Sequence, residues 1–165
     1  SILEPEIPDP FLYLAQIRLA QQKLESGLTL LKKLRNKFPK NVNITLYLGY
    51  AYEKLKRHLK AEILYREVLF QKPENRRALL RLGSVLIKLG KREEARSFLE
   101  NLTQKFPAYS AAWWNLGIVY LQLGEIELAE FAWEESLRLE PDNSQVRVSL
   151  EQLREDRFLS QYNNL

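Results

Sequence analysis

Residues 110–143 read SAAWWNLGIVYLQLGEIELAEFAWEESLRLEPDN, and the skeleton of this 34-residue stretch recurs three times upstream. The clearest markers of the recurrence are prolines spaced 34 residues apart, at Pro39, Pro73, Pro107 and Pro141. Glycines keep the same spacing at Gly49, Gly83 and Gly117, and alanines keep it at Ala61, Ala95 and Ala129. Self-similarity at a period of about 20 to 50 residues is typical of solenoids, which are proteins built from stacked repeats. The sequence therefore predicts four copies of one structural unit.

Each copy is predicted to contain two helices. The first helix of the last copy has apolar residues at helical spacing, at Ala112, Leu116, Val119 and Leu123. Gly117 on this helix and Ala129 on the next are small, so the two helix axes can approach closely. Pro141 ends the second helix because it lacks an N–H and disfavours a helical residue before it. Gly90 and Gly124 fall at the turn between the helices, where a left-handed backbone is expected.

The order of these residues resembles the tetratricopeptide repeat family. The pattern Trp-x2-Leu-Gly-x2-Tyr, then Ala-x3-aromatic, then Pro, is filled by Trp113, Leu116, Gly117, Tyr120, Ala129, Trp133 and Pro141. The resemblance implies an all-α, right-handed solenoid of four helix-turn-helix repeats, at residues 8–41, 42–75, 76–109 and 110–143. It also implies a module that binds other proteins and catalyses no reaction.

The two ends of the chain depart from the repeat. Residues 1–7 are predicted to be an extended segment, because Pro5, Pro8 and Pro10 disfavour a helix. Residues 144–165 are predicted to form a capping helix and a tail. Three apolar residues of this region, Val146, Leu150 and Leu153, continue the pattern of a first helix. Glu151 and Arg154, however, replace the small residue and the tyrosine, and a further helix packed there would bury both charges.

Composition excludes several classes of protein. Charged residues make up 28% of the chain and hydrophobic residues 45%, which is the balance of a soluble globular domain. No apolar run approaches the roughly 18 residues of a membrane-spanning helix. The 165 residues include no cysteine, so a disulfide framework is excluded and the redox compartment stays open. They also include no methionine, which predicts a processed product or a domain excised from a longer or anchored protein.

Charge is distributed unevenly along the chain. Residues 11–109 carry 21 basic and 8 acidic residues, a balance of +13, whereas residues 110–143 carry one basic and seven acidic residues, a balance of −6. Such asymmetry can steer a charged partner or promote self-association. The simpler interpretation is a set of solvated outer faces.

The sequence offers little for catalysis, and we predict a protein that is not an enzyme. His58 is the only histidine, and no Ser–Asp pair accompanies it, so it is predicted to be a surface or packing residue. One histidine without cysteines predicts no metal site of the usual kind. Phosphate-binding glycine-rich loops are absent as well, so no cofactor is predicted.

The resemblance places certain positions of each first helix on the concave face of the stack. In this chain, the partner-binding residues predicted from those positions are Tyr13, Gln16, Tyr47, Tyr50, Arg77, Arg81, Ser84, Lys88, Trp114, Asn115 and Ile118. Exposed aromatic and apolar residues in such a row favour a binding surface. The competing interpretation is that they are buried against neighbouring helices or against the N-terminal segment. The predicted ligand is an extended or helical peptide with apolar side chains and at least one acidic group.

The arginine pair of this row suggests how an acidic group would be held. Arg77 and Arg81 are four residues apart and therefore share one helix face. The nearby carboxylates that could neutralise them are Glu53, or Glu4 and Glu6 of the N-terminal segment. A ligand carboxylate could be held there by forked guanidinium donors.

An alternative function is binding to RNA or to an acidic membrane surface through the basic residues. Five of them are clustered in sequence, at Lys32, Lys33, Arg35, Lys37 and Lys40. This cluster belongs to a predicted second helix, away from the concave face, and forms no stripe with Arg77 and Arg81. Binding to nucleic acid is therefore disfavoured. A measured affinity for generic RNA that is strong and depends steeply on salt would instead support this alternative.

Overall fold

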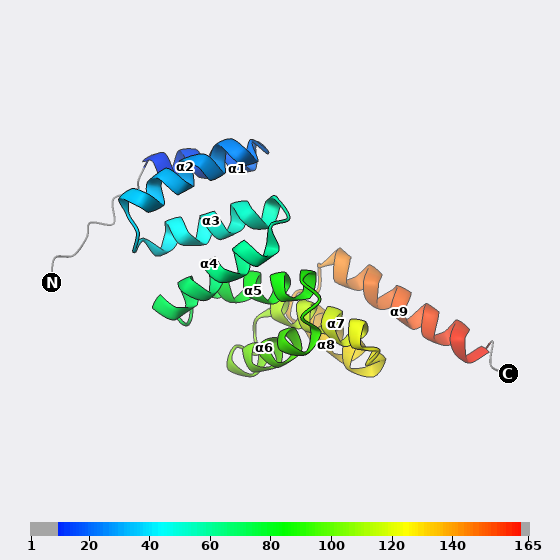
Figure 1. Cartoon of the computed structure of the whole chain (residues 1–165). Coiled ribbons are helices and arrows are strands. Elements are labelled where there is room, and N and C mark those ends of the chain that lie inside the picture. The colour runs from blue at the N-terminus through cyan, green and yellow to red at the C-terminus, as the bar shows by residue number, and fades with distance from the viewer. Residues whose placement is uncertain (1–9, 163–165) are drawn as a thin grey trace. The chain divides into compact units, whose positions relative to one another are not determined.

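Helices account for all the regular structure of residues 10–162, the part of the chain that the computed structural model describes (Figure 1). No strand occurs within this range, and the predicted all-α fold class is confirmed. The predicted extended segment, residues 1–7, lies outside the described residues. The chain divides into two compact units, residues 1–85 and 86–165, and each is described here by itself.

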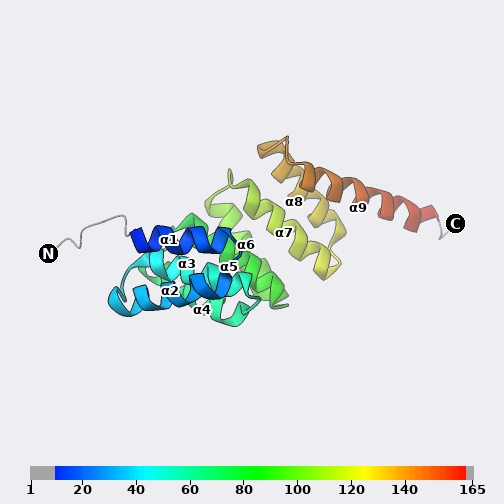
Figure 2. The same ribbon diagram turned by 90° about the horizontal axis from the view of Figure 1, so that it is seen from above.

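The first unit contains two helical hairpins and most of a fifth helix. Helix α1 (Pro10–Ala20) packs against α2 (Leu24–Lys37), and α3 (Val42–Lys54) packs against α4 (His58–Gln71). Contacts of α3 with α2 and α1 join the hairpins, as Figure 2 shows from above. Helix α5 (Arg76–Lys88) follows and runs across the boundary of the two units.

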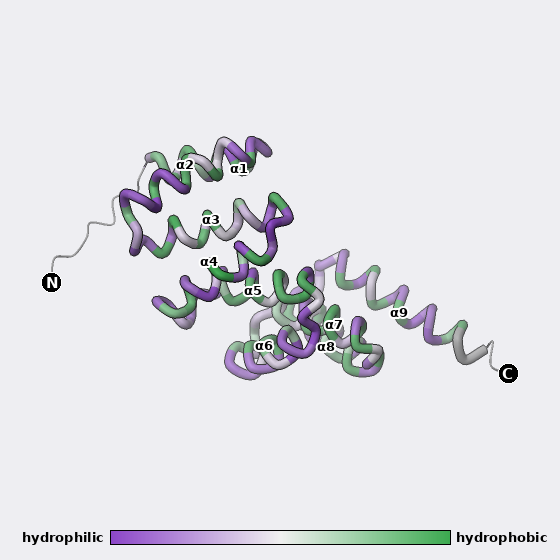
Figure 3. The backbone as a smooth tube through the Cα atoms, in the orientation of Figure 1, coloured by the Kyte–Doolittle hydropathy of each residue, from purple (hydrophilic) through white to green (hydrophobic). Residues whose placement is uncertain are grey.

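The second unit holds the end of α5 and four further helices. These are α6 (Arg92–Lys105), α7 (Ser110–Leu123), α8 (Ile126–Leu139) and α9 (Ser144–Tyr162). Helices α7 and α8 form a hairpin, while α6 packs on α7 and α9 packs on α8. Hydrophobic and hydrophilic residues alternate along the helices of both units, as amphipathic helices require (Figure 3).

The turns that follow α1, α3, α5 and α7 each contain a residue with a left-handed backbone, and these residues keep the 34-residue period. Their φ angles are 59° at Gln22, 58° at Lys56, 70° at Gly90 and 79° at Gly124. The left-handed conformation predicted for Gly90 and Gly124 is confirmed. In the first two turns the same conformation is forced on residues with a Cβ, which disfavours it by about 1–2 kcal/mol.

Replacing Lys56 by glycine should therefore stabilise the protein. We expect a gain of about 1 kcal/mol, because glycine adopts positive φ without a steric penalty and Lys56 has no ion pair with any described residue. Urea denaturation followed by circular dichroism measures the change. Gly124→Ala is the matched reverse substitution and should lose a similar amount, since no atom lies within 4 Å of the added Cβ and only the backbone conformation is at stake. Equal stability of all three proteins would contradict this account of the turns.

Helices α3, α5 and α9 each begin after an asparagine, and these asparagines are separated by multiples of the 34-residue period. The side-chain oxygens of Asn41, Asn75 and Asn143 accept hydrogen bonds of 3.1, 3.0 and 3.2 Å from the backbone N–H groups three residues ahead. Each bond satisfies one of the N–H groups that a helix start leaves unpaired. Tyr109 occupies the corresponding place before α7 and makes no such side-chain cap.

The glycines on the first helices make room for large aromatic residues of the second helices. A Cβ added to Gly49 would lie 2.7 Å from the ring of Tyr65, and one added to Gly117 would lie 2.3 Å from the indole of Trp133. The sequence interpretation placed Gly117 against Ala129. Ala129 is buried as expected, but the closest neighbour of Gly117 is the large ring four residues further along α8.

Helix α9 packs on α8 through both apolar and charged residues. Val146, Leu150 and Leu153 are buried, as their spacing predicted. Arg154 stays exposed and forms ion pairs with Glu130, at 2.7 Å, and with Glu134. The hydrogen bond from Arg154 lowers the pKa of Glu130 below its ordinary value. The charge predicted to prevent further packing thus helps to fasten α9 to α8.

Among the residues that the structure describes, no helix is both long and apolar enough to cross a lipid bilayer.

Candidate partner-binding face

Seven of the predicted binding residues lie on α1, α3 and α5 of the first unit. We call these seven residues the helix-A face, because each of these helices is the first (helix A) of a predicted helix pair. They are Tyr13 and Gln16 of α1, Tyr47 and Tyr50 of α3, and Arg77, Arg81 and Ser84 of α5. Tyr13 and Arg77 are exposed and the other five are half-buried, so every member of the helix-A face retains some access to solvent. Helix α1 contacts α3, and side-chain hydrogen bonds join α3 to α5. The seven residues therefore follow one another in the order α1, α3, α5.

Arg81 is held by a carboxylate of the chain itself. Its Nη1 donates to Oε2 of Glu53 at 3.0 Å, and the hydroxyl of Tyr65 donates to the same oxygen at 2.9 Å. Glu53 is one of the carboxylates that the sequence put within reach of the arginine pair. Tyr65 is fully buried, and this burial raises the pKa of its hydroxyl far above the ordinary value of 10.0. The network ties α3, α4 and α5 together, so Arg81 has a structural role.

The ring of Tyr50 lies close to two cations. The guanidinium carbon of Arg81 is 4.1 Å from its centroid, and Nζ of Lys54 is 5.4 Å away. Cations at these distances are attracted by the ring electrons, which fixes the orientation of the tyrosine. The sequence analysis did not single out Lys54, although its spacing of four residues from Tyr50 on one helix was a usable signal.

Arg77 is the guanidinium of this face that remains open. It is exposed, and its Nη1 makes a long bond of 3.4 Å to the hydroxyl of Tyr47. No carboxylate among residues 10–162 forms an ion pair with it. The two arginines of the predicted pair therefore differ: Arg81 is already neutralised by Glu53, whereas Arg77 can accept a new acidic partner.

The remaining predicted residues belong to the second unit. Trp114 is half-buried, and its ring stacks on Trp133 at a centroid distance of 5.2 Å, with the Trp133 indole N–H donating to the Trp114 carbonyl at 3.1 Å. Asn115 is buried, Ile118 is half-buried and Lys88 is exposed. Trp114 thus contributes to the packing of α7 on α8, a role that the sequence analysis did not assign to it.

A second polar network of the same kind occurs in this unit. The hydroxyl of Tyr120 donates to Glu100 at 3.0 Å, and Arg96 bonds both to Glu100, at 3.0 Å, and to Glu125, at 2.8 Å. Burial and the bond to Glu100 raise the pKa of Tyr120 to about 12. Tyrosine hydroxyls paired with glutamates therefore join neighbouring helices in both units, and such bonds between distant positions leave no mark in the repeat pattern.

Comparison with known proteins identifies the family to which this architecture belongs. Residues 12–76 and 80–144 each match the tetratricopeptide repeat family, and the chain belongs to this family. Proteins of the family are typically interaction scaffolds without catalytic activity, so the chain is a protein-interaction module in this general sense.

Solved structures with the same fold are known. MamA from Desulfovibrio magneticus RS-1 has a TM-score of 0.78 and 22% identity, over 89% of this chain and 83% of that chain. TTC0263, a thermophilic repeat protein of Thermus thermophilus, has a TM-score of 0.77 and 24% identity, over 96% and 89%. A repeat protein from Parabacteroides merdae has a TM-score of 0.74 and 22% identity, over 90% and 60%. These likenesses concern the fold alone. No curated protein sequence matches the chain.

Proposed function

We propose that the helix-A face binds a peptide segment of a partner protein, one that carries apolar side chains and an acidic group. The observation that supports this most is the exposed guanidinium of Arg77, which contacts the hydroxyl of Tyr47 on the neighbouring helix α3. Arginine and tyrosine are the residues most often found at energetic hot spots of interfaces. A carboxylate can accept two parallel bonds from one guanidinium, which gives orientation as well as affinity.

The two arginines have different roles in this proposal. Arg77 takes the ligand carboxylate, because no carboxylate of the described chain competes for it. Arg81 is a positioning residue that holds the ring of Tyr50 while Glu53 balances its charge. Tyr13 and Tyr47 offer their ring surfaces to the apolar side chains of the peptide.

The proposal keeps the other predicted residues in lesser roles. Lys88, Trp114 and Ile118 remain proposed binding residues of the second unit taken by itself, and Asn115 would contribute least because it is buried. We also propose the four repeats at residues 8–41, 42–75, 76–109 and 110–143, with α9 as the cap of the last one. In a stack of repeats, a terminal helix of this kind covers the apolar side of its neighbour and exposes a polar one.

Substitution of Arg77 tests the proposed function. We expect Arg77→Ala to weaken binding of the partner by about 1–3 kcal/mol, through loss of an exposed, charged hydrogen-bonding group of the face. The fold should be unaffected, since Arg77 is exposed and makes one long bond. Isothermal calorimetry measures the affinity, with a partner obtained by co-purification from the source cell.

Two further variants interpret the result. Arg77→Lys keeps the charge but loses the forked donors, so its affinity should lie between those of the alanine variant and the unaltered protein. Arg57→Ala is the control. Arg57 is exposed, lies in the turn before α4 and pairs with Glu25 of α2, outside the helix-A face, so this variant should bind the partner normally. If Arg77→Ala bound as tightly as the unaltered protein, the helix-A face would not be the site.

A further inference from the structure

The first unit is strongly basic, and its arginines and lysines differ in how far they form ion pairs with its carboxylates. Residues 10–85 carry 16 basic and 5 acidic residues. Four of these acids, Glu25, Glu53, Glu62 and Glu67, are ion-paired to arginines. Six lysines around α2 and α4, by contrast, form no ion pair with any described carboxylate: Lys32, Lys33, Lys37, Lys56, Lys60 and Lys72. The unit therefore presents an excess of unpaired ammonium groups to solvent.

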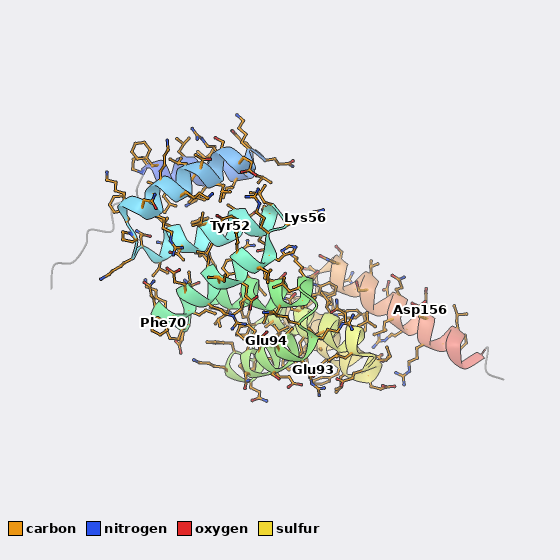
Figure 4. The ribbon with its side chains drawn as sticks, viewed as in Figure 1. Tyr52, Lys56, Phe70, Glu93, Glu94 and Asp156 are labelled. Carbon is orange, nitrogen blue, oxygen red and sulfur yellow. The ribbon has the colours of Figure 1, made fainter. Side chains whose placement is uncertain are left out.

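A row of large apolar side chains stands out from α4. Leu59, Ile63 and Phe70 are 63%, 66% and 89% exposed. Spacings of four and seven residues place all three on one line along the helix. Figure 4 labels Phe70 near the end of α4 and Lys56 in the turn before it. We call these three residues the α4 ridge, since they project from one helix and do not line a groove between two.

Lysines flank this ridge on the side of α2. Nζ of Lys60, next to Leu59 in sequence, is 5.5 Å from the ring centroid of Tyr52, and Nζ of Lys32 on α2 is 5.9 Å from the same centroid. The pair of Arg35 with Glu67, at 2.6 Å, holds α2 beside α4. We call the α4 ridge, together with the lysines of α2 and α4 that form no ion pair, the α2–α4 surface of the first unit.

We propose that this α2–α4 surface docks on an anionic lipid membrane. Apolar side chains that project from a helix between lysines are suited to enter the headgroup region, while the ammonium groups attract anionic lipids. A partner helix would need an apolar groove, whereas the ridge offers one row. RNA would need exposed rings for base stacking, whereas two of the three ridge residues are aliphatic. This surface is separate from the helix-A face, so the inference does not depend on the proposed function.

Binding to lipid vesicles tests the proposal. Vesicles of phosphatidylcholine alone and vesicles containing one part phosphatidylglycerol to three parts phosphatidylcholine are mixed with the full chain and sedimented. We expect binding to the anionic vesicles only, and a fall in binding as salt is raised. Ile63→Ser with Phe70→Ser should weaken it about tenfold by removing the inserted side chains. Lys32→Glu with Lys60→Glu should abolish it.

A matched control removes exposed apolar residues elsewhere. Val148→Ser with Leu159→Ser replaces two side chains of α9 that are 61% and 56% exposed, and this variant should bind vesicles normally. Circular dichroism establishes that each variant is folded. No binding to anionic vesicles would overturn the proposal, as would equal loss in the control. Tight binding to single-stranded RNA that the serine variants leave unchanged, without vesicle binding, would assign the lysines to nucleic acid instead.

The absence of cysteine allows a direct measurement of insertion. A single cysteine at position 70 (Phe70→Cys) or 148 (Val148→Cys) can be labelled specifically with an environment-sensitive fluorophore. On addition of anionic vesicles, the emission of the label at position 70 should shift to the blue, and the emission at position 148 should not change. Binding without a shift at position 70 would mean adsorption by charge alone, which contradicts insertion of the ridge.

Discussion

Replacing Trp133 by alanine should destabilise the protein by about 3–5 kcal/mol, the usual cost of removing a buried aromatic ring. The side chain is only 3% exposed. It fills the space beside Gly117, stacks on Trp114 and donates to the Trp114 carbonyl, so its loss leaves a cavity and removes a hydrogen bond between α7 and α8. Urea denaturation followed by far-UV circular dichroism measures the effect.

Trp113→Ala is the matched control, because it removes the same ring from a half-buried position on the same helix hairpin. Trp113 packs edge-on against Phe131, which is itself exposed, and its indole N–H donates to the carbonyl of Pro107 at 2.9 Å. The control should lose clearly less stability than Trp133→Ala. Equal losses would mean that the contact between Gly117 and Trp133 is not the centre of this hairpin.

Replacing Gly49 by leucine should destabilise the first unit by about 1–3 kcal/mol or more, through overpacking. A Cβ alone would lie 2.7 Å from the Tyr65 ring, and Tyr65 is buried and bonded to Glu53, so it has little freedom to move away. Because Glu53 also holds Arg81, we expect the damage to reach the helix-A face and weaken partner binding. Thermal denaturation and calorimetry measure the two effects.

The double variant Gly49→Leu with Tyr65→Leu tests whether overpacking against Tyr65 causes this loss of stability. The smaller side chain at position 65 frees space for the new leucine, so the double variant should lose less stability than the sum of the two single variants. Strict additivity would show that the two residues do not compete for the same space.

Much of the fold follows from the sequence because the repeat marks the same structural position several times. The prolines fix where helices end, and the left-handed glycines at positions 90 and 124 fix where the chain turns from one helix into the next. The left-handed conformations of Gln22 and Lys56 could not be read from residue type, since neither favours positive φ, although their place in the period indicated them. The partner of Gly117 was predicted less well, because small residues on two helices indicate close approach but not which side chain fills the gap.

The family pattern could select the candidate residues but could not predict the contacts that they make. The family pattern selected Tyr47, Tyr50, Arg77 and Arg81, and the structure brings them together in the first unit. The pattern could not show that Arg81 is neutralised, because its pairing with Glu53 depends on how side chains 28 positions apart meet in space. It likewise missed the stacking of Trp114 on Trp133.

Site-specific photo-crosslinking is the most direct test of the claim that the helix-A face binds the partner. A photoreactive amino acid is placed at position 13, whose side chain is 66% exposed on the helix-A face, or at position 70, which is 89% exposed on the α4 ridge. Both proteins are irradiated in an extract of the source cell. We predict a discrete protein adduct from position 13 that disappears in the Arg77→Ala background, and none from position 70. A protein adduct from position 70 alone, or an adduct from position 13 that persists without Arg77, would contradict the account.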